Sequence, residues 1–266
     1  MSITWSAYKR ARRRSRQAWA ILGLAAATVV AGLSWFFTTG QFNAAEPWVS
    51  GPSEAPVYNP AWMKPISGAA PVAAEKASEA LEHLPVKGRA PKTDYDRAAF
   101  GQAWADADRN GCDTRNDILR RDLSAVEFTQ GSSCKVAAGE FHEPYTGAHL
   151  AFLRGQDTSA AVQIDHVVAL ADAWQKGAQQ LSAQQRQTLA NDPLNLIAVD
   201  GPANVKKGAG DAATWLPSNK NFRCHYVARQ ISVKAAYKLW ITQAEKDAMK
   251  GVLSACPEQQ TIYNAR

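Results

Sequence analysis

Twenty consecutive residues without a formal charge, 18–37, constrain this 266-residue chain more than any other feature. As an α-helix rising about 1.5 Å per residue, this run would be about 30 Å long, which matches the hydrocarbon core of a membrane. Residues 1–17 carry six Lys and Arg side chains and no acid, which predicts an N-terminus that stays in the cytoplasm. The run is therefore predicted to be a transmembrane anchor or a signal segment. Everything after it is predicted to lie outside the cytoplasm, membrane-anchored or, if the segment is cleaved, secreted.

Residues 38–77 are predicted to form a linker rich in proline and alanine. Eight of the thirteen prolines lie between residues 44 and 91, and large apolar side chains are few, which is typical of an extended tether. A short helix starting near Pro71 would dock on the domain through Leu81 and Leu84. The folded domain is therefore predicted over residues 78–266, a length that can bury one substantial core.

The net charge of +6 equals the six basic residues of the N-terminal flank, so the rest of the chain has 24 basic and 24 acidic residues. A local excess remains between residues 201 and 240, where Asp211 is the single acid. This excess predicts a surface suited to a polyanion, although a solvated helix face explains the last two of its residues equally well. The basic residues are Lys206, Lys207, Lys220, Arg223, Arg229, Lys234 and Lys238.

Four cysteines lie in the part of the chain predicted to be outside the cytoplasm, where thiols oxidise. Of the three possible pairings, the sequential one closes the shortest loops, which predicts the disulfides Cys112–Cys134 and Cys224–Cys256. A zinc site is the alternative, but no Cys-x-x-Cys spacing occurs.

Apolar runs predict two strands and a helix around one Asp-His pair. Strand-like residues 150–154 precede these elements; the first strand, at 161–168, contains Asp165-His166, and the second apolar run spans 194–199. A helix should begin at Gly201-Pro202 and end at Gly208, with Asn204 and Lys207 one turn apart on a shared face. Because successive strand residues point to opposite faces, the strand must end or bulge at Asp165-His166 if both side chains are to reach one substrate.

These segments resemble those of the HNH endonucleases, and in particular the secreted branch related to the C-terminal domain of GmrSD-type restriction proteins. The resemblance covers most of residues 80–256, and the third signature residue, often histidine in that family, is Asn204 here. The strings that carry it are Tyr95-Asp96-Arg97, Phe100-Gly101, Trp104, Gly111-Cys112-Asp113-Thr114-Arg115-Asn116, Gln163-Ile164-Asp165-His166-Val167-Val168, Asn191-Asp192-Pro193-Leu194-Asn195-Leu196, Asn204-Val205-Lys206-Lys207, Trp215-Leu216-Pro217 and Tyr226-Val227-Ala228-Arg229-Gln230.

The resemblance implies an α+β fold with a ββα-metal core, additional helices and a catalytic site. His166 would be the general base, Asp165 and Asn204 would hold one Mg²⁺ or Mn²⁺ ion, and Asn195 would orient the loop. The residue types suit these roles, since a neutral imidazole accepts a proton near neutral pH and hard oxygen ligands favour these ions over zinc. The residues expected to meet a substrate phosphate are Lys207 and Arg115.

A second oxygen-rich segment resembles an EF-hand calcium loop. Asp106, Asp108, Asn110 and Asp117 occupy its ligand positions, and Gly111 its sixth position. The twelfth residue is Asp instead of the longer Glu, and a turn pinned by the Cys112 disulfide is the alternative interpretation.

The sequence thus predicts a metal-dependent endonuclease that hydrolyses nucleic acid, DNA preferred, outside the cytoplasm. Membrane association would come from residues 18–37, and no obligate protein partner is inferred. The alternative is a non-catalytic cell-envelope binding module that keeps the scaffold and binds calcium. Metal-dependent cleavage of plasmid DNA separates the two.

Overall fold

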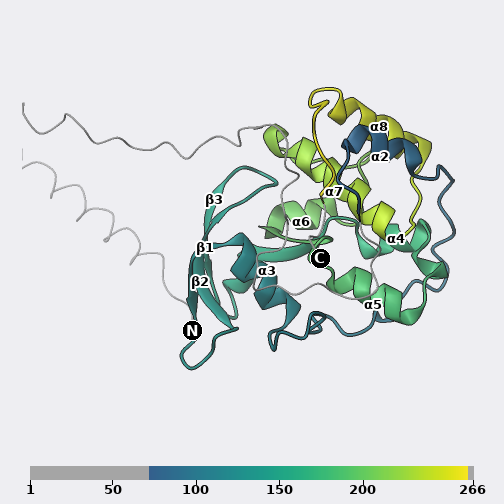
Figure 1. Cartoon of the computed structure of the whole chain (residues 1–266). Helices are drawn as coiled ribbons and strands as arrows, with labels where there is room; N and C mark the ends of the chain where they lie inside the picture. The colour runs from purple at the N-terminus through teal and green to yellow at the C-terminus, as the bar shows by residue number, and fades with distance from the viewer. Residues whose placement is uncertain (1–71, 263–266) are drawn as a thin grey trace, which may run out of the picture. The chain divides into compact units, whose positions relative to one another are not determined.

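The computed structural model describes residues 72–262, which form an α+β fold (Figure 1). The predicted cytoplasmic flank 1–17, the predicted membrane segment 18–37 and all but the last residues of the linker 38–77 lie outside the described residues. Within 72–262, no helix is both long and apolar enough to cross a membrane.

The described chain begins with packed structure. Helix α2 (Ala77–His83) begins later than the expected start near Pro71, because residues 72–76 are not helical. It packs against α7 (Arg223–Ala236) and α8 (Gln243–Leu253), and Leu81 and the following residue Leu84 are buried as expected. Thr261 ties the two ends together, because its hydroxyl donates to the Ala73 carbonyl at 2.7 Å and its amide donates to the Glu75 carbonyl at 2.9 Å. Packing contacts therefore begin upstream of residue 78.

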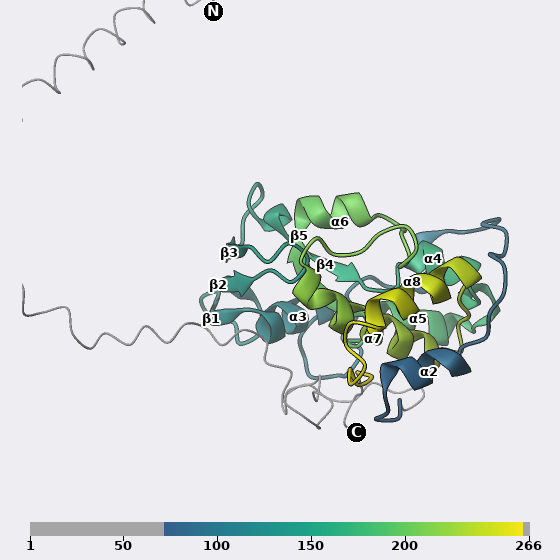
Figure 2. The same cartoon turned by 90° about the horizontal axis from the view of Figure 1, so that it is seen from above.

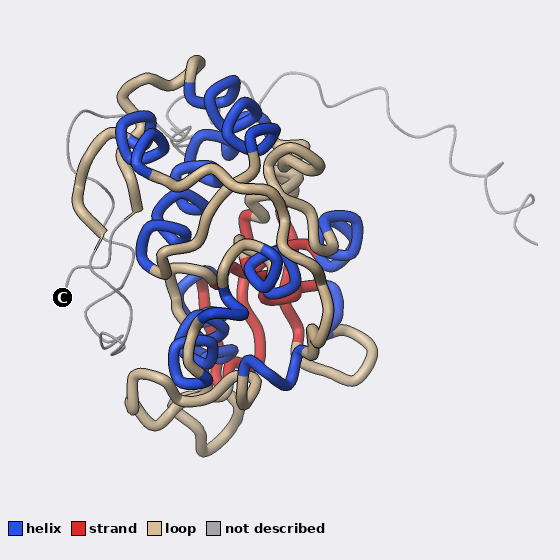
Figure 3. The backbone as a smooth tube through the Cα atoms, turned by 90° about the vertical axis from the view of Figure 1, so that its right-hand side faces the viewer, coloured by secondary structure: helices blue, strands red, loops and turns tan. Residues whose placement is uncertain are grey.

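Two antiparallel sheets organise the rest. One has the order β1 (Ser124–Phe128), β2 (Val136–His142) and β3 (His149–Leu153), and the other pairs β4 (Val162–His166) with β5 (Leu196–Asp200). The three-stranded sheet lies on one side of the molecule and helices α2, α7 and α8 gather on the other, with β4 and β5 between them (Figure 2). Figure 3 shows helices and loops surrounding the strands.

Both faces of the β4–β5 pair are buried. Val162 and Ile164 pack with the three-stranded sheet and helix α3 (Thr114–Asp122), whereas Ile197 and Val199 face the larger helical core. The pairing is regular from Val162 to His166, and β4 ends there without a bulge. The strand therefore ends at the Asp-His pair, which is one of the two arrangements that the sequence required.

Helix α6 (Gly201–Lys207) follows β5 directly and lies over both strands (Figure 2), at the bounds expected from the sequence. Gly201 is needed where the helix begins, because a Cβ atom there would lie 2.3 Å from the Ala160 carbonyl oxygen. Gly208 ends the helix with a φ of 52°, a conformation that favours glycine. Between β4 and β5 the chain forms α4 (Leu170–Gln175) and α5 (Ala183–Asn191), and Ser182 with Gln185 forms the capping box of α5. The 3-10 helices are η1 (Arg97–Phe100), η2 (Ser159–Ala161), η3 (Ala178–Gln180) and η4 (Lys220–Phe222).

The structure contains two disulfides, and they join the expected pairs. Cys112 and Cys134 have Cα atoms 5.3 Å apart, and Cys224 and Cys256 have Cα atoms 6.4 Å apart. The first ties the segment before α3 to the segment before β2, and the second ties the start of α7 to the end of α8. Each closes a loop and so restricts the unfolded chain.

A buried network of charges joins the helices. Lys176 lies 2.8 Å from Asp172, 2.8 Å from Asp211 and 2.6 Å from Glu245. Lys234 lies 2.7 Å from the same Glu245. All five side chains are buried, so opposite charges offset the cost of removing each one from water.

This network corrects the predicted basic surface over residues 201–240. Lys234 is buried and forms an ion pair within the network. Arg229 is fully buried, and its guanidinium donates to backbone carbonyls. Lys207 is buried beside β4. Counting charges along the sequence overestimated the surface because it does not show which helix face a lysine occupies. The exposed members of the group are Lys206, Lys220 and Lys238.

Candidate functional site

His166 ends β4 with its side chain directed toward α5. Its Nε2 atom lies 2.9 Å from the Ala190 carbonyl oxygen. Because a carbonyl only accepts hydrogen bonds, Nε2 carries the hydrogen, and Nδ1 is the nitrogen with a free lone pair in the neutral ring. Burial lowers the pKa of His166 to about 4, against the opposing effects of the Ala190 hydrogen bond and the Asp165 charge. The imidazole is therefore neutral at physiological pH and able to accept a proton.

The Asp165 side chain lies on the opposite face of the strand, and two donors contact its buried carboxylate. The Tyr145 hydroxyl donates to Oδ2 at 2.6 Å, and the Lys207 ammonium lies 2.9 Å from Oδ2 and 3.1 Å from Oδ1. Burial and the nearby Asp165 charge raise the pKa of Tyr145 well above its usual range, so the phenol stays protonated and acts as a donor. The carboxylate is thus held in place from two sides.

Lys207 also donates to the His166 carbonyl oxygen at 2.8 Å, and its side chain is buried. It therefore fixes the backbone of the Asp-His pair as well as the Asp165 carboxylate. This position corrects the expected contact between Lys207 and a substrate phosphate, because the ammonium points into the protein. Helix α6 presents Lys207 to β4. The sequence predicted the helix that carries Lys207 correctly, but not that its side chain is buried.

Asn204 is one turn before Lys207 on α6 and is half-buried. Its Nδ2 donates to the Gln163 side-chain oxygen at 2.8 Å, so the amide nitrogen faces β4 and the amide oxygen is directed elsewhere. Gln163 lies on the same face of β4 as Asp165, two residues before it. Helix and strand are thereby linked next to the Asp-His pair.

Asn195 lies directly before β5 and is fully buried. Its Oδ1 accepts from the Val168 amide at 2.8 Å, and its Nδ2 donates to the Val168 and Leu189 carbonyls, each at 3.3 Å. These bonds hold both backbone groups of Val168, the second residue after His166. Asn195 thus lies behind the site and orders the chain there, away from the hollow that the other candidates line.

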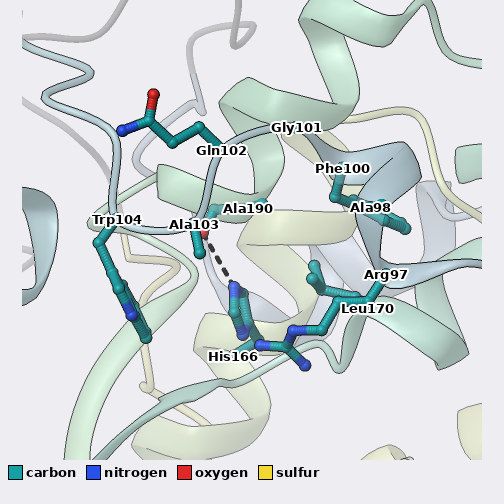
Figure 4. A pocket seen from close by; sticks show the side chains of 10 residues that line it. All are labelled: Arg97, Ala98, Phe100, Gly101, Gln102, Ala103, Trp104, His166, Leu170 and Ala190. Carbon is teal, nitrogen blue, oxygen red and sulfur yellow. Dashed lines mark hydrogen bonds between the residues drawn. The ribbon is translucent and has the colours of Figure 1, made fainter.

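Asp165, His166 and Asn204 line one polar hollow of about 290 Å³. A second hollow of about 260 Å³ shares His166, Leu170 and Arg97 with it and adds Trp104. The Arg97 side chain reaches the His166 ring, and Trp104 lies on the other side of that ring (Figure 4). The structure therefore brings the three principal candidates together at the point where β4 ends.

Arg115 lies elsewhere. Its guanidinium donates to the Val162 carbonyl at 3.4 Å, and Val162 is four residues before His166 on the same strand. Because a strand rises about 3.3 Å per residue, the position on β4 that Arg115 contacts lies about 13 Å along the strand from His166. The expected phosphate contact of Arg115 is therefore not formed at this hollow, and burial together with the nearby Arg154 charge lowers the pKa of its guanidinium.

Sequence reasoning missed Arg97, Trp104 and Tyr145. Arg97 and Trp104 precede the Asp-His pair by more than sixty residues and come from η1 and the loop after it. Arg97 and Trp104 both belonged to the family-like segments, but no spacing rule connected either of them with His166. Tyr145 comes from the turn between β2 and β3, and its approach to Asp165 depends wholly on tertiary packing.

The calcium-like segment uses its oxygens internally. The Asp106 carboxylate accepts from the Asn110 and Gly111 amides at 3.0 and 2.9 Å, and Asp108 accepts from Asn110. Asp117 is buried, and burial raises its pKa to about 6. Within residues 72–262, no group of three or more His, Cys, Asp or Glu side chains is placed to hold a metal ion. The turn interpretation fits these contacts better than the expected calcium site at Asp106, Asp108, Asn110 and Asp117.

Residues 113–252 match the family model of the C-terminal domain of GmrSD restriction endonucleases. The chain belongs to this family. The GmrSD C-terminal domain match contains β4, β5 and α6, and with them Asp165, His166, Asn195 and Asn204. Arg97 and Trp104 lie upstream of it. Membership in a family of restriction endonuclease domains indicates a nuclease.

A curated relative extends the likeness beyond the GmrSD C-terminal domain match. The chain is 36% identical over 185 residues to an uncharacterized secreted protein of Arthroderma benhamiae. The aligned residues cover 69% of this chain and 86% of the relative. No solved structure matches the chain.

Proposed function

We propose that this protein is a divalent-metal-dependent endonuclease that hydrolyses phosphodiester bonds of nucleic acid, with DNA as the preferred substrate, outside the cytoplasm. The observation that carries the proposal is the shared polar hollow at the end of β4, lined by Asp165, His166 and Asn204. These three residues lie in the part of the chain that matches the GmrSD domain family. The ββα arrangement of β4, β5 and α6 is the scaffold expected of an HNH site.

His166 is proposed as the general base. The Ala190 hydrogen bond fixes the hydrogen on Nε2 and leaves Nδ1 to take a proton from water. A pKa near 4 keeps the ring neutral before it reacts. Asn195 serves this residue indirectly, because it holds the backbone of Val168 two residues downstream.

Asp165 and Asn204 are proposed to hold one Mg²⁺ or Mn²⁺ ion. One carboxylate and one amide oxygen beside a polar hollow fit a hard cation that keeps several water ligands. The Asp165 oxygens accept from Tyr145 and Lys207, and a carboxylate has about four acceptor positions, which leaves room for one further partner. When bound, the ion would neutralise developing charge on the phosphate and on the departing oxygen.

Arg97 is proposed to take the phosphate-binding role that the sequence suggested for Lys207 and Arg115. It is exposed and lines both hollows next to His166 (Figure 4). A guanidinium there can donate two parallel hydrogen bonds to phosphate oxygens. Lys207 would instead act from within, by holding Asp165 and the His166 carbonyl.

Location outside the cytoplasm is supported by two observations. The chain contains two disulfides, which persist in oxidising surroundings, and its relative in Arthroderma benhamiae is described as secreted. The membrane anchor at 18–37 and the division of the chain into flank 1–17, anchor, linker 38–77 and nuclease domain 78–266 remain part of the proposal.

The test is cleavage of supercoiled plasmid DNA by the full-length protein with Mg²⁺ or Mn²⁺, followed by chelation. Nicking that stops on chelation is expected, and His166→Ala should abolish it while the protein still unfolds cooperatively. His149→Ala, on the exposed surface of β3, is the matched control and should cleave like the wild type. Wild-type protein that binds but never cleaves would instead favour the non-catalytic binding module, and equal cleavage by His166→Ala would exclude His166 as the base.

A further inference from the structure

The second hollow differs from the first in its chemistry. Its walls are mostly apolar, with Phe100, Leu170 and the Trp104 ring, and Arg97 is its one charged side chain (Figure 4). It meets the polar hollow at His166 and Arg97, which line both. A ligand that occupied both would need an anionic part beside a flat apolar part.

Trp104 packs against the smaller apolar core beside the three-stranded sheet, and it has two further properties that packing alone does not require. Its indole is only partly buried and stacks on the His166 ring with a centroid distance of 6.2 Å and an interplanar angle of 19°. Its φ is 57°, a region that costs conformational energy for a bulky residue. The surrounding structure therefore holds an aromatic face at the rim of the site in spite of backbone strain.

A nucleotide has the two parts that these hollows call for. Its phosphate is an anion for Arg97, and its base is a flat ring that stacks on aromatic side chains whatever its sequence. We infer that the hollow beside Trp104 binds the base of a nucleotide next to the scissile phosphate. This inference rests on the proposed nuclease function and specifies its substrate.

Base binding at Trp104 selects for unpaired nucleic acid. In a duplex, both faces of each base are covered by its neighbours, so the base must leave the stack before an indole can cover it, which costs free energy. A single strand presents its bases without that cost. The preferred substrate is therefore a single strand, or a duplex where it is frayed or unpaired.

The test measures binding without cleavage. Full-length protein in detergent and EDTA is titrated into a fluorescein-labelled 12-nucleotide single strand and into a hairpin duplex of the same sequence, and fluorescence anisotropy gives Kd. Two variants separate stacking from packing, since Trp104→Phe keeps an aromatic ring and Trp104→Leu keeps apolar bulk alone. Trp240→Phe, a buried tryptophan packed against Gly177, is the matched control.

We expect tighter binding of the single strand than of the duplex. Trp104→Leu should weaken single-strand binding by about 5- to 150-fold, the loss of one base–aromatic stack, while Trp104→Phe stays close to the wild type and duplex binding changes little. Equal affinities for the two nucleic acids, or a Trp104→Leu variant that binds the single strand like the wild type, would overturn the inference.

The two proposals fail in different ways. Plasmid cleavage without any effect of Trp104→Leu on single-strand binding would refute the base-binding hollow and leave the nuclease intact. Ring-dependent binding of single strands by a wild-type protein that never cleaves would support the hollow and refute the nuclease.

Discussion

The buried ion pair between Lys207 and Asp165 offers the sharpest test of how the site is held together. Lys207→Met keeps most of the side-chain volume but removes the ammonium, which lies 2.9 and 3.1 Å from the two Asp165 oxygens and 2.8 Å from the His166 carbonyl oxygen. Both side chains are buried. The change therefore leaves the Asp165 carboxylate buried, and of its two donors, Tyr145 and Lys207, it keeps only the Tyr145 hydroxyl.

The expected cost follows from these contacts. Removing one partner of a buried ion pair destabilises a protein by about 3–5 kcal/mol, and the His166 carbonyl also loses a hydrogen bond of about 1 kcal/mol. The free energy of unfolding of Lys207→Met should fall by about 5 kcal/mol. Adding Asp165→Asn removes the unpaired charge, so the double variant should be more stable than the sum of the two single losses predicts, by about 2 kcal/mol.

Magnesium should distinguish the variant from the wild type. In Lys207→Met a divalent cation at Asp165 no longer meets the repulsion of an ammonium, so it should bind more tightly, and at about 100 times its Kd it would restore about 2.7 kcal/mol. Guanidinium chloride unfolding in EDTA and in magnesium chloride measures both effects. Unfolding of Lys207→Met at the wild-type midpoint would refute the structural role of the ion pair. Equal stabilisation of both proteins by magnesium would refute Asp165 as a metal ligand in contact with Lys207.

Two further predictions concern residues around the site and in the charge network. Asn195→Ala should lower the free energy of unfolding by about 3 kcal/mol, because the buried Val168 amide and carbonyl lose their partners. Gln185→Ala, at the exposed N-terminus of α5, is the control. A smaller loss of stability in Asn195→Ala than in this control would contradict the role of Asn195. For Asp211, burial acts to raise the pKa, but Lys176, with the Thr214 hydrogen bond and the Arg89 charge, outweighs burial and holds the pKa at about 2. The group therefore stabilises the fold above its unfolded pKa near 3.8 and loses this effect as the pH falls through about 2. Between pH 4 and pH 2 the wild type should therefore lose about 2 kcal/mol more stability than Asp211→Asn, and equal slopes of unfolding free energy against pH would show that Asp211 is not linked to acid unfolding.

Local patterns predicted the elements that carry the site. Proline at the start of α6, glycine after it and the apolar runs of β4 and β5 are short-range signals, and the structure has these elements close to the expected residues. The disulfide pairs followed from loop length in the same way. The environments of charged residues did not follow, because Lys207 and Lys234 are buried by segments far away in the sequence. Their partners, Asp165 and Glu245, become visible only when the chain is folded.

The position of the Asp-His pair explains why the site depends on the apolar packing on both faces of the β4–β5 pair. Asp165 and His166 alternate across β4, so Asp165 is held from the side of Tyr145 and α6, and His166 from the side of α5 and Trp104. A strand that continued would keep these two side chains on separate faces, whereas one that ends lets both border a single hollow. Packing on one side positions the carboxylate and packing on the other positions the imidazole. A substitution in either core should therefore disturb one member of the pair first, and the proposed chemistry requires both.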